Sequence, residues 1–223
     1  MDEVISITTR EAKEFLLNNL ELDLKKFGFK KNIKQSHLKR RHSLGFDIIG
    51  IGLLNYWPLN ISINTIGITT RINKVENIVN PFIPKEYFNH EYSSTTVTIL
   101  DQLKEDIQNI ELVFYDDLPP AYLAVKDLIE TKGLIILERN SDLQKLNKEL
   151  KDRILLGQEK GWVHSISCLM QSLTLMYLCN DALFDEFSER YKAFKLPQDN
   201  REAIGKKALT DLIVYLKSGI IGK

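Results

Sequence analysis

The chain has 223 residues, of which 43% are hydrophobic and 27% charged, and its 30 basic residues balance 30 acidic ones. This is the composition of an ordinary globular protein, without the overall basic balance typical of nucleic-acid-binding domains. Two cysteines are too few for a disulfide framework, and reduced thiols are typical of the cytoplasm. Because the first residues include neither a basic segment nor a long apolar run, we expect no signal peptide and no membrane contact, and therefore a cytoplasmic protein.

The chain begins with an amphipathic helix, which we predict from about Thr9 to Phe27. Thr8 and Glu11 have the spacing of a capping box, in which each side chain bonds the other residue's backbone N–H. Gly28 follows where a left-handed backbone closes a helix, and Phe29 can then pack back on the helix. The pattern therefore predicts a complete helix that ends in a tight turn.

A β-rich region follows, and its short connections predict an antiparallel sheet, because parallel strands need long crossovers. The apolar phase changes between Ile63 and Ile66, which predicts a bulge or twist there. A short helix is expected over residues 71–79, after the first three strands. The expected strands cover residues 33–41, 46–54, 60–70 and 92–99.

From Leu100 onward the apolar spacing changes to three and four residues, which predicts helices. We expect a helix that begins at Pro119 or Pro120 and ends at Gly133, and another that Ser141 caps. The remaining expected helices cover residues 101–109, 162–177, 184–194 and 204–215.

The predicted fold class is therefore α+β. An N-terminal helix packs on an antiparallel sheet of about four strands, and a mostly α-helical C-terminal half follows. We divide the chain into an α+β domain, residues 1–139, and a helical C-terminal extension packed on it, residues 140–223.

Reactive side chains form no complete motif in the sequence. His164 and Cys168 are four residues apart on an expected helix, but a zinc site needs further ligands. His37, His42 and His90 could transfer protons if the fold brought them together. A hydrolase with a site assembled from distant residues is therefore an alternative. Our first expectation is a protein without catalytic residues, metal site or cofactor.

Basic residues are concentrated early in the chain. Between Leu24 and Phe46 there are eight lysines and arginines and no acid. We interpret this segment as a solvated sheet edge, where lysines prevent edge-to-edge pairing. The alternative is a nucleic-acid-binding protein that uses the basic segment 25–41, with Lys39, Arg40 and Arg41 as contacts.

Two other short segments favour protein binding. Tyr56 and Trp57 lie in an expected turn between strands, and aromatic residues at such positions often anchor interfaces. Asp116 and Asp117 precede two prolines, where a loop can present negative charge to a basic partner. We therefore predict a protein-binding protein without catalytic activity.

Four segments occur in a characteristic order along the first two thirds of the chain: Leu24 to Lys31, Leu38 to Arg41, Asn60 to Ile68 and Asp127 to Leu134. Their order resembles that of the bacterial domain-of-unknown-function family 4304. Some members of this family lie in polymorphic-toxin loci, so the resemblance implies an immunity-type inhibitor that neutralises a cognate bacterial toxin. The family has no established catalytic residues.

Overall fold

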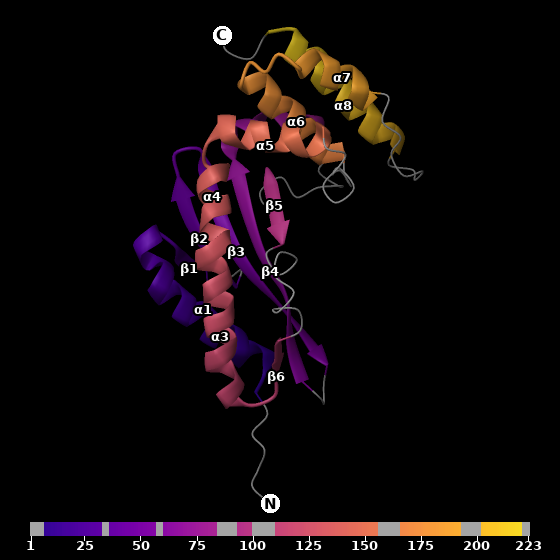
Figure 1. Ribbon diagram of the computed structural model, residues 1–223. Coiled ribbons are helices and arrows are strands. Elements are labelled where there is room, and N and C mark those ends of the chain that lie inside the picture. Colours follow the sequence, from indigo (N-terminus) through magenta and orange to yellow (C-terminus); the bar gives the residue numbers. More distant parts are fainter. Residues whose placement is uncertain are drawn as a thin grey trace, which may run out of the picture. The chain divides into compact units, whose positions relative to one another are not determined.

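Figure 1 presents the protein as a computed structural model. The chain forms two compact units, residues 1–70 with 96–139 and residues 71–95 with 140–223. The predicted boundary between residues 139 and 140 recurs in this division, whereas residues 71–95 belong with the C-terminal residues. The two-domain organisation itself stays a prediction. The structure describes residues 7–32, 36–56, 60–83, 93–99, 110–155, 166–192 and 202–219.

The first helix, α1 (Thr9–Leu24), begins with the predicted capping box. The backbone N–H of Glu11 donates to Thr8 Oγ1 over 3.2 Å, and that of Thr8 donates to the Glu11 carboxylate over 2.9 Å. A 3-10 turn, η1 (Lys25–Phe27), follows, and Gly28 then takes a φ of +85°. The N–H of Phe29 bonds the Leu24 carbonyl over 3.3 Å, and the Phe29 ring is fully buried. The predicted helix and its closure are therefore confirmed.

The sheet of the first unit has six described strands. Five of them pair in the order β1-β2-β3-β4-β5, and the sixth, β6, also pairs with β4. The strand pairs β1–β2, β2–β3, β4–β5 and β4–β6 are antiparallel, as predicted. The strands are β1 (Lys30–Asn32), β2 (His37–His42), β3 (Gly45–Tyr56), β4 (Asn60–Ile72), β5 (Thr96–Ile99) and β6 (Ile110–Leu112).

Two strand predictions need correction. The strand expected over residues 33–41 is described only as β2 (His37–His42), and it forms a hairpin with β1, which was not predicted and in which Lys30 pairs with Lys39. Backbone pairing forms this hairpin although β1 has no apolar residue that could reveal it. β6 was not predicted, since three residues carry no readable period. The helix expected over residues 101–109 lies outside the described residues.

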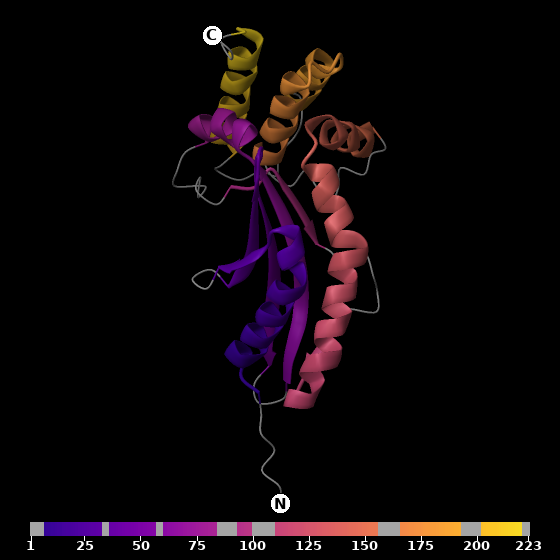
Figure 2. The same ribbon diagram turned by 90° about the vertical axis from the view of Figure 1, so that its left-hand side faces the viewer.

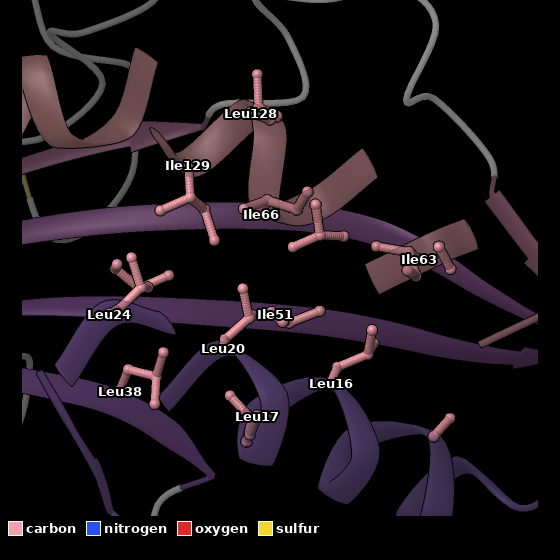
Figure 3. Packing of buried hydrophobic residues seen from close by; sticks show 14 of the residues in the cluster. Leu16, Leu17, Leu20, Leu24, Leu38, Ile51, Ile63, Ile66, Leu128 and Ile129 are labelled. Carbon is pink, nitrogen blue, oxygen red and sulfur yellow. The ribbon is translucent and has the colours of Figure 1, made fainter. Parts of the chain in front are cut away.

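Apolar side chains of α1, the sheet and a second long helix form the core of the first unit (Figure 3). The second helix, α3 (Leu118–Leu128), continues through a π-helical turn, η8 (Ile129–Gly133), into α4 (Leu134–Asn140). The prediction that the helix ends at Gly133 is therefore wrong. The helix continues because it buries Leu137 in the core one turn later. Residues that are at most 3% exposed in this core include Leu16, Leu20, Ile51, Ile66, Leu128 and Ile129.

α1 and α3 contact each other and lie against the strands (Figure 2). Lys126 on α3 lies 2.7 Å from the Asp23 carboxylate on α1, and the Tyr122 hydroxyl donates to the same carboxylate. These hydrogen bonds from Lys126 and Tyr122 lower the pKa of Asp23. The contacts of Lys126 and Tyr122 with Asp23 fix the position of α3 along the axis of α1.

The alternation of β4 breaks where the sequence predicts it. Ile63 and Ile66 are both buried in the core, although they are three residues apart, while Asn64 between them is exposed. β6 pairs with β4 before this point and β5 pairs with it after, so the irregularity separates two pairing segments along one edge.

The second unit is helical, and α6 is its central helix, in contact with four others. From Ser167 to Met176 nearly every residue of α6 is buried, which is typical of a helix surrounded on all sides. Its helices are α2 (Asn73–Val79), the 3-10 turn η2 (Asn80–Phe82), α5 (Leu143–Leu155), α6 (Ile166–Leu178), α7 (Phe184–Lys192) and α8 (Glu202–Lys217).

The N-terminus of α5 differs from the prediction. Asp142, not Ser141, caps the helix, because its carboxylate accepts hydrogen bonds from the backbone N–H groups of Gln144 and Lys145 over 2.9 and 3.1 Å. Cys168 and Cys179 form no disulfide. Within the described ranges, no helix has both the length and the apolar character that crossing a bilayer requires.

Candidate binding surface

The predicted protein contacts lie at one end of the first unit's sheet. Tyr56 is the last residue of β3 and is 52% exposed, whereas Trp57 lies outside the described residues. Asp116 is exposed in the 3-10 turn η7 (Tyr115–Asp117), which follows β6. Because Ile61 at the start of β4 pairs with Leu112 at the end of β6, the chain leaves β3 and β6 at the same end (Figure 1).

Three side chains that the sequence analysis missed complete this end. Phe114 and Tyr115 are 45% and 44% exposed, and Leu54 on β3 is 43% exposed. A signal was available, because a Phe-Tyr pair stands directly before the predicted acidic loop. We call Leu54, Tyr56, Phe114 and Tyr115 the aromatic end.

Hydrogen bonds hold the η7 turn in a defined conformation. Asp117 does not point freely to solvent, because its carboxylate accepts from the backbone N–H groups of Val113 and Phe114, both over 2.8 Å. The Tyr115 hydroxyl donates to the Glu11 carboxylate over 2.7 Å. Hydrogen bonds from Thr8 and from Tyr115 lower the pKa of Glu11 to about 2. Glu11 is therefore an anion at neutral pH beside the aromatic end.

The three basic residues of the nucleic-acid alternative do not share one face. Arg40 lies on the face of β2 that the helices cover, where its Nε is 2.7 Å from Asp47. Lys39 and Arg41 lie on the opposite face, because side chains alternate along a strand. The ammonium of Lys39 lies 3.6 Å from the centre of the Phe46 ring.

Asp47 is the centre of a buried charged cluster and is fully inaccessible to solvent. Besides Arg40, its carboxylate accepts a hydrogen bond from the Thr70 hydroxyl over 2.8 Å, and His42 Nε2 lies 3.6 Å away. The Arg40 guanidinium in turn lies 5.0 Å from the centre of the buried Phe29 ring. Each partner stabilises the others' placement, so this cluster extends the core and orders the ends of three strands.

The residues of the hydrolase alternative are not brought together in the described part of the chain. His37 and His42 are five positions apart on β2 and therefore lie on opposite faces. His90 and His164 lie outside the described residues. Across the described ranges, no group of three or more His, Cys, Asp or Glu side chains is arranged to hold a metal ion.

A second buried polar cluster lies inside the second unit. Glu76 is fully buried, and its Oε1 accepts from Thr95 Oγ1 over 2.8 Å and from Gln171 Nε2 over 2.9 Å. Gln171 also donates to the Ser94 carbonyl. Glu76 Oε2 has no hydrogen-bond partner among the residues that the structure describes. These bonds connect α2 to α6 and to the residues before β5.

A third cluster lies around Asp181, after α6. Lys151 Nζ and Asn147 Nδ2 donate to its carboxylate over 2.8 and 2.6 Å. Burial alone would raise the pKa of Asp181, but the hydrogen bonds from Lys151, the Leu183 N–H and Asn147 lower it. Burial raises the pKa of the neighbouring Cys179 thiol. The cluster therefore joins α5 to the turn before α7.

A groove of about 490 Å³ opens on the first unit beside α1. Its rim carries Arg10, Lys13 and Lys31, but Arg10 lies 3.0 Å from Glu14 and Lys31 donates to Asn18. Of these charges, Glu14 offsets that of Arg10 within α1.

Comparison of the chain with protein-family models, with curated proteins and with solved structures finds no match.

Proposed function

We propose that this protein acts by binding another protein through the aromatic end, and that no reactive group of its own is needed for this role. The observation that carries the proposal is that Leu54, Tyr56, Phe114 and Tyr115, each 43–52% exposed, lie in segments that leave the sheet at the same end. Clustered exposed apolar side chains with polar neighbours are typical of interaction sites, and tyrosine is enriched among interface residues that dominate affinity.

The conformation of the η7 turn supports this role. The Asp117 carboxylate fixes the backbone N–H groups of Val113 and Phe114, and the Tyr115 hydroxyl is held by Glu11. Binding orders less of the protein when a contact loop is already in place, so less conformational entropy is lost on association. A turn that is held from both sides is therefore well suited to present Phe114 and Asp116.

The charge of this end favours a basic partner. Asp116 and Glu111 are exposed, and Glu11 is ionised down to a pH of about 2. Complementary charge speeds encounter and excludes acidic competitors. A nucleic-acid-degrading toxin would be such a partner, since it carries positive charge to bind its substrate. Together with the resemblance to family 4304, this supports an immunity-type inhibitor that neutralises a bacterial toxin in the cytoplasm.

Site-specific photo-crosslinking tests the proposal. A photoreactive phenylalanine analogue is placed at position 56 or 114 of the full chain, and the matched control carries it at Leu123 on α3, which is 59% exposed. After nuclease treatment, which removes bridging nucleic acid, we expect one protein to be crosslinked from positions 56 and 114 and not from position 123.

The captured protein is then purified and its affinity is measured. We expect Tyr56→Ser with Phe114→Ser to weaken binding about 100-fold or more, because each is expected to act as a dominant contact. Leu123→Ser should leave binding unchanged, and Asp116→Lys should slow association at low salt. Equal crosslinking from all three positions, or full affinity of the double variant, contradicts the proposal.

A further inference from the structure

The groove beside α1 encloses about 490 Å³, within the range of about 300–1,000 Å³ that is typical of pockets for small organic molecules. One wall is α1, which contacts the hairpin of β1 and β2. Thr9, Lys13 and Leu17 follow one another on this wall at four-residue spacing, so they lie on one face of the helix. The hairpin contributes Lys31, Asn32 and Ser36. The groove therefore lies wholly within the first unit.

Lys13 brings a positive charge that nothing in the described part of the chain offsets. Its side chain is half-buried and lines the groove, but its ammonium makes neither an ion pair nor a hydrogen bond with the described residues. Arg10, in contrast, lies 3.0 Å from Glu14. Lys31 donates to the amide oxygen of Asn18, which is neutral and leaves the charge of the lysine in place. The described lining thus has an excess of positive charge, centred on Lys13.

Ser36 supplies a second hydrogen-bond donor to the same groove. Among the described residues its hydroxyl has no hydrogen-bond partner, so it is available to a bound molecule. The rest of the lining is mostly apolar and includes the buried Leu17 side chain. Pockets with apolar walls and a few polar groups use the polar groups to orient a ligand. The lining therefore matches a molecule that joins an anionic group to an apolar body.

We propose that this groove binds a small organic carboxylate. Lys13 and Ser36 receive the carboxylate, and the apolar body of the ligand lies along Leu17. A carboxylate fits better than a phosphate for two reasons. The guanidinium of Arg10, whose fork would suit a phosphate, is already held by Glu14. A phosphate would also bring about two negative charges close to the Glu14 carboxylate. This site is additional to protein binding and shares no residue with the aromatic end.

An NMR titration of the isotope-labelled full chain tests the proposal, with octanoate as the probe. We expect saturable shifts of the backbone amides of Lys13, Leu17, Lys31 and Ser36, with a Kd of about 1 mM or tighter, which is ordinary for a ligand of about ten heavy atoms. Octanol has the same apolar body without the charge. It should bind at least about tenfold more weakly, because it cannot form a charged hydrogen bond with Lys13.

Substitutions in the groove should separate the charge from the apolar contact. Lys13→Gln should weaken octanoate binding about tenfold or more and leave octanol binding unchanged, whereas Lys13→Arg, which keeps the charge, should retain most of the affinity. Ser36→Ala should weaken octanoate binding about threefold. The matched control is Lys25→Gln, which removes an exposed lysine just beyond α1 and should change nothing. Spectra of the unliganded variants ensure that folded proteins are compared.

Several results would overturn the inference. They are shifts confined to residues outside the groove, equal affinity for octanoate and octanol, or equal losses in Lys13→Gln and Lys25→Gln. Tenfold tighter binding of octyl phosphate would identify a phosphate as the ligand, and tenfold tighter binding of a polyglutamate peptide would identify an acidic protein segment. Tyr56→Ser with Phe114→Ser should retain octanoate binding, so failure of this site and failure of the aromatic end are separate outcomes.

Discussion

Replacing Asp47 with alanine should destabilise the first unit by about 3 kcal/mol. The substitution removes the hydrogen bonds that Arg40 and Thr70 donate to the carboxylate, and it leaves the Arg40 guanidinium without its counter-charge. Breaking a buried ion pair from one side costs about 3–5 kcal/mol. The Arg40 side chain is 19% exposed, so water partly compensates it and we expect the lower end of that range.

Urea unfolding measures this effect in a Trp162→Phe background. The remaining Trp57 belongs by sequence to the first unit and Trp162 to the second, so fluorescence then reports on the first unit. With a urea dependence of about 2 kcal/mol per M, a loss of about 3 kcal/mol moves the midpoint by about 1.5 M.

A double-mutant cycle separates the pair from its members. Arg40→Met alone leaves a buried carboxylate, and Asp47→Leu alone leaves the guanidinium without its counter-charge, so each should be costly. Arg40→Met with Asp47→Leu removes both charges and should cost less than the sum of these two single variants, by at least about 1 kcal/mol. If Asp47→Ala costs under about 1 kcal/mol, or if the free-energy losses of the two single variants add up to that of the double variant, this ion pair does not stabilise the sheet.

Three further outcomes are expected. Gly28→Val should cost about 1 kcal/mol or more, because a β-branched residue is strained at a φ of +85°, while Gly28→Asn should cost less; equal thermal stability of wild type and Gly28→Val would contradict this. Tyr115→Phe should raise the pKa of Glu11 from about 2 toward its ordinary 4.5, as followed by NMR titration. Since folding lowers that pKa, the contribution of Glu11 to stability is complete above pH 4.5 and is lost as the pH falls toward 2, and an unchanged acid limb in the variant would refute the assignment. In a Cys168→Ser background, Cys179 should react more slowly with a thiol reagent at pH 8 than free cysteine does, because burial raises its pKa; a rate equal to that of free cysteine would contradict this.

Local signals in the sequence predicted local structure well. The capping box of Thr8 and Glu11 and the turn at Gly28 depend on residues within four positions of one another, and all are present. Gly133 shows the limit of such reasoning. Glycine often ends a helix, but here the apolar residues that follow it are drawn into the core and the helix continues through a π-helical turn.

The charged cluster and the aromatic end depend on strand register, which the sequence does not state. Arg40 and Asp47 are seven residues apart and become direct neighbours because the turn between β2 and β3 pairs them. Leu38 and Arg40 are two residues apart on β2 and therefore lie on the same face of the sheet. Because Leu38 is apolar, this spacing indicated that Arg40 also points toward the core. Phe114 reaches the vicinity of the β3 end through the pairing of β6, a strand too short to predict.

The order in which the chain is synthesised has a consequence for the second unit. Gln171 follows its partner Glu76 by 95 residues, so α2 leaves the ribosome long before α6 has been made. Until then the side chains of Val75 and Val79, which are fully buried in the finished protein, have no helix to cover them. A ribosome paused shortly before residue 166 would therefore hold a nascent chain with this apolar segment outside the ribosome and uncovered, and chaperones that recognise such segments should engage it there.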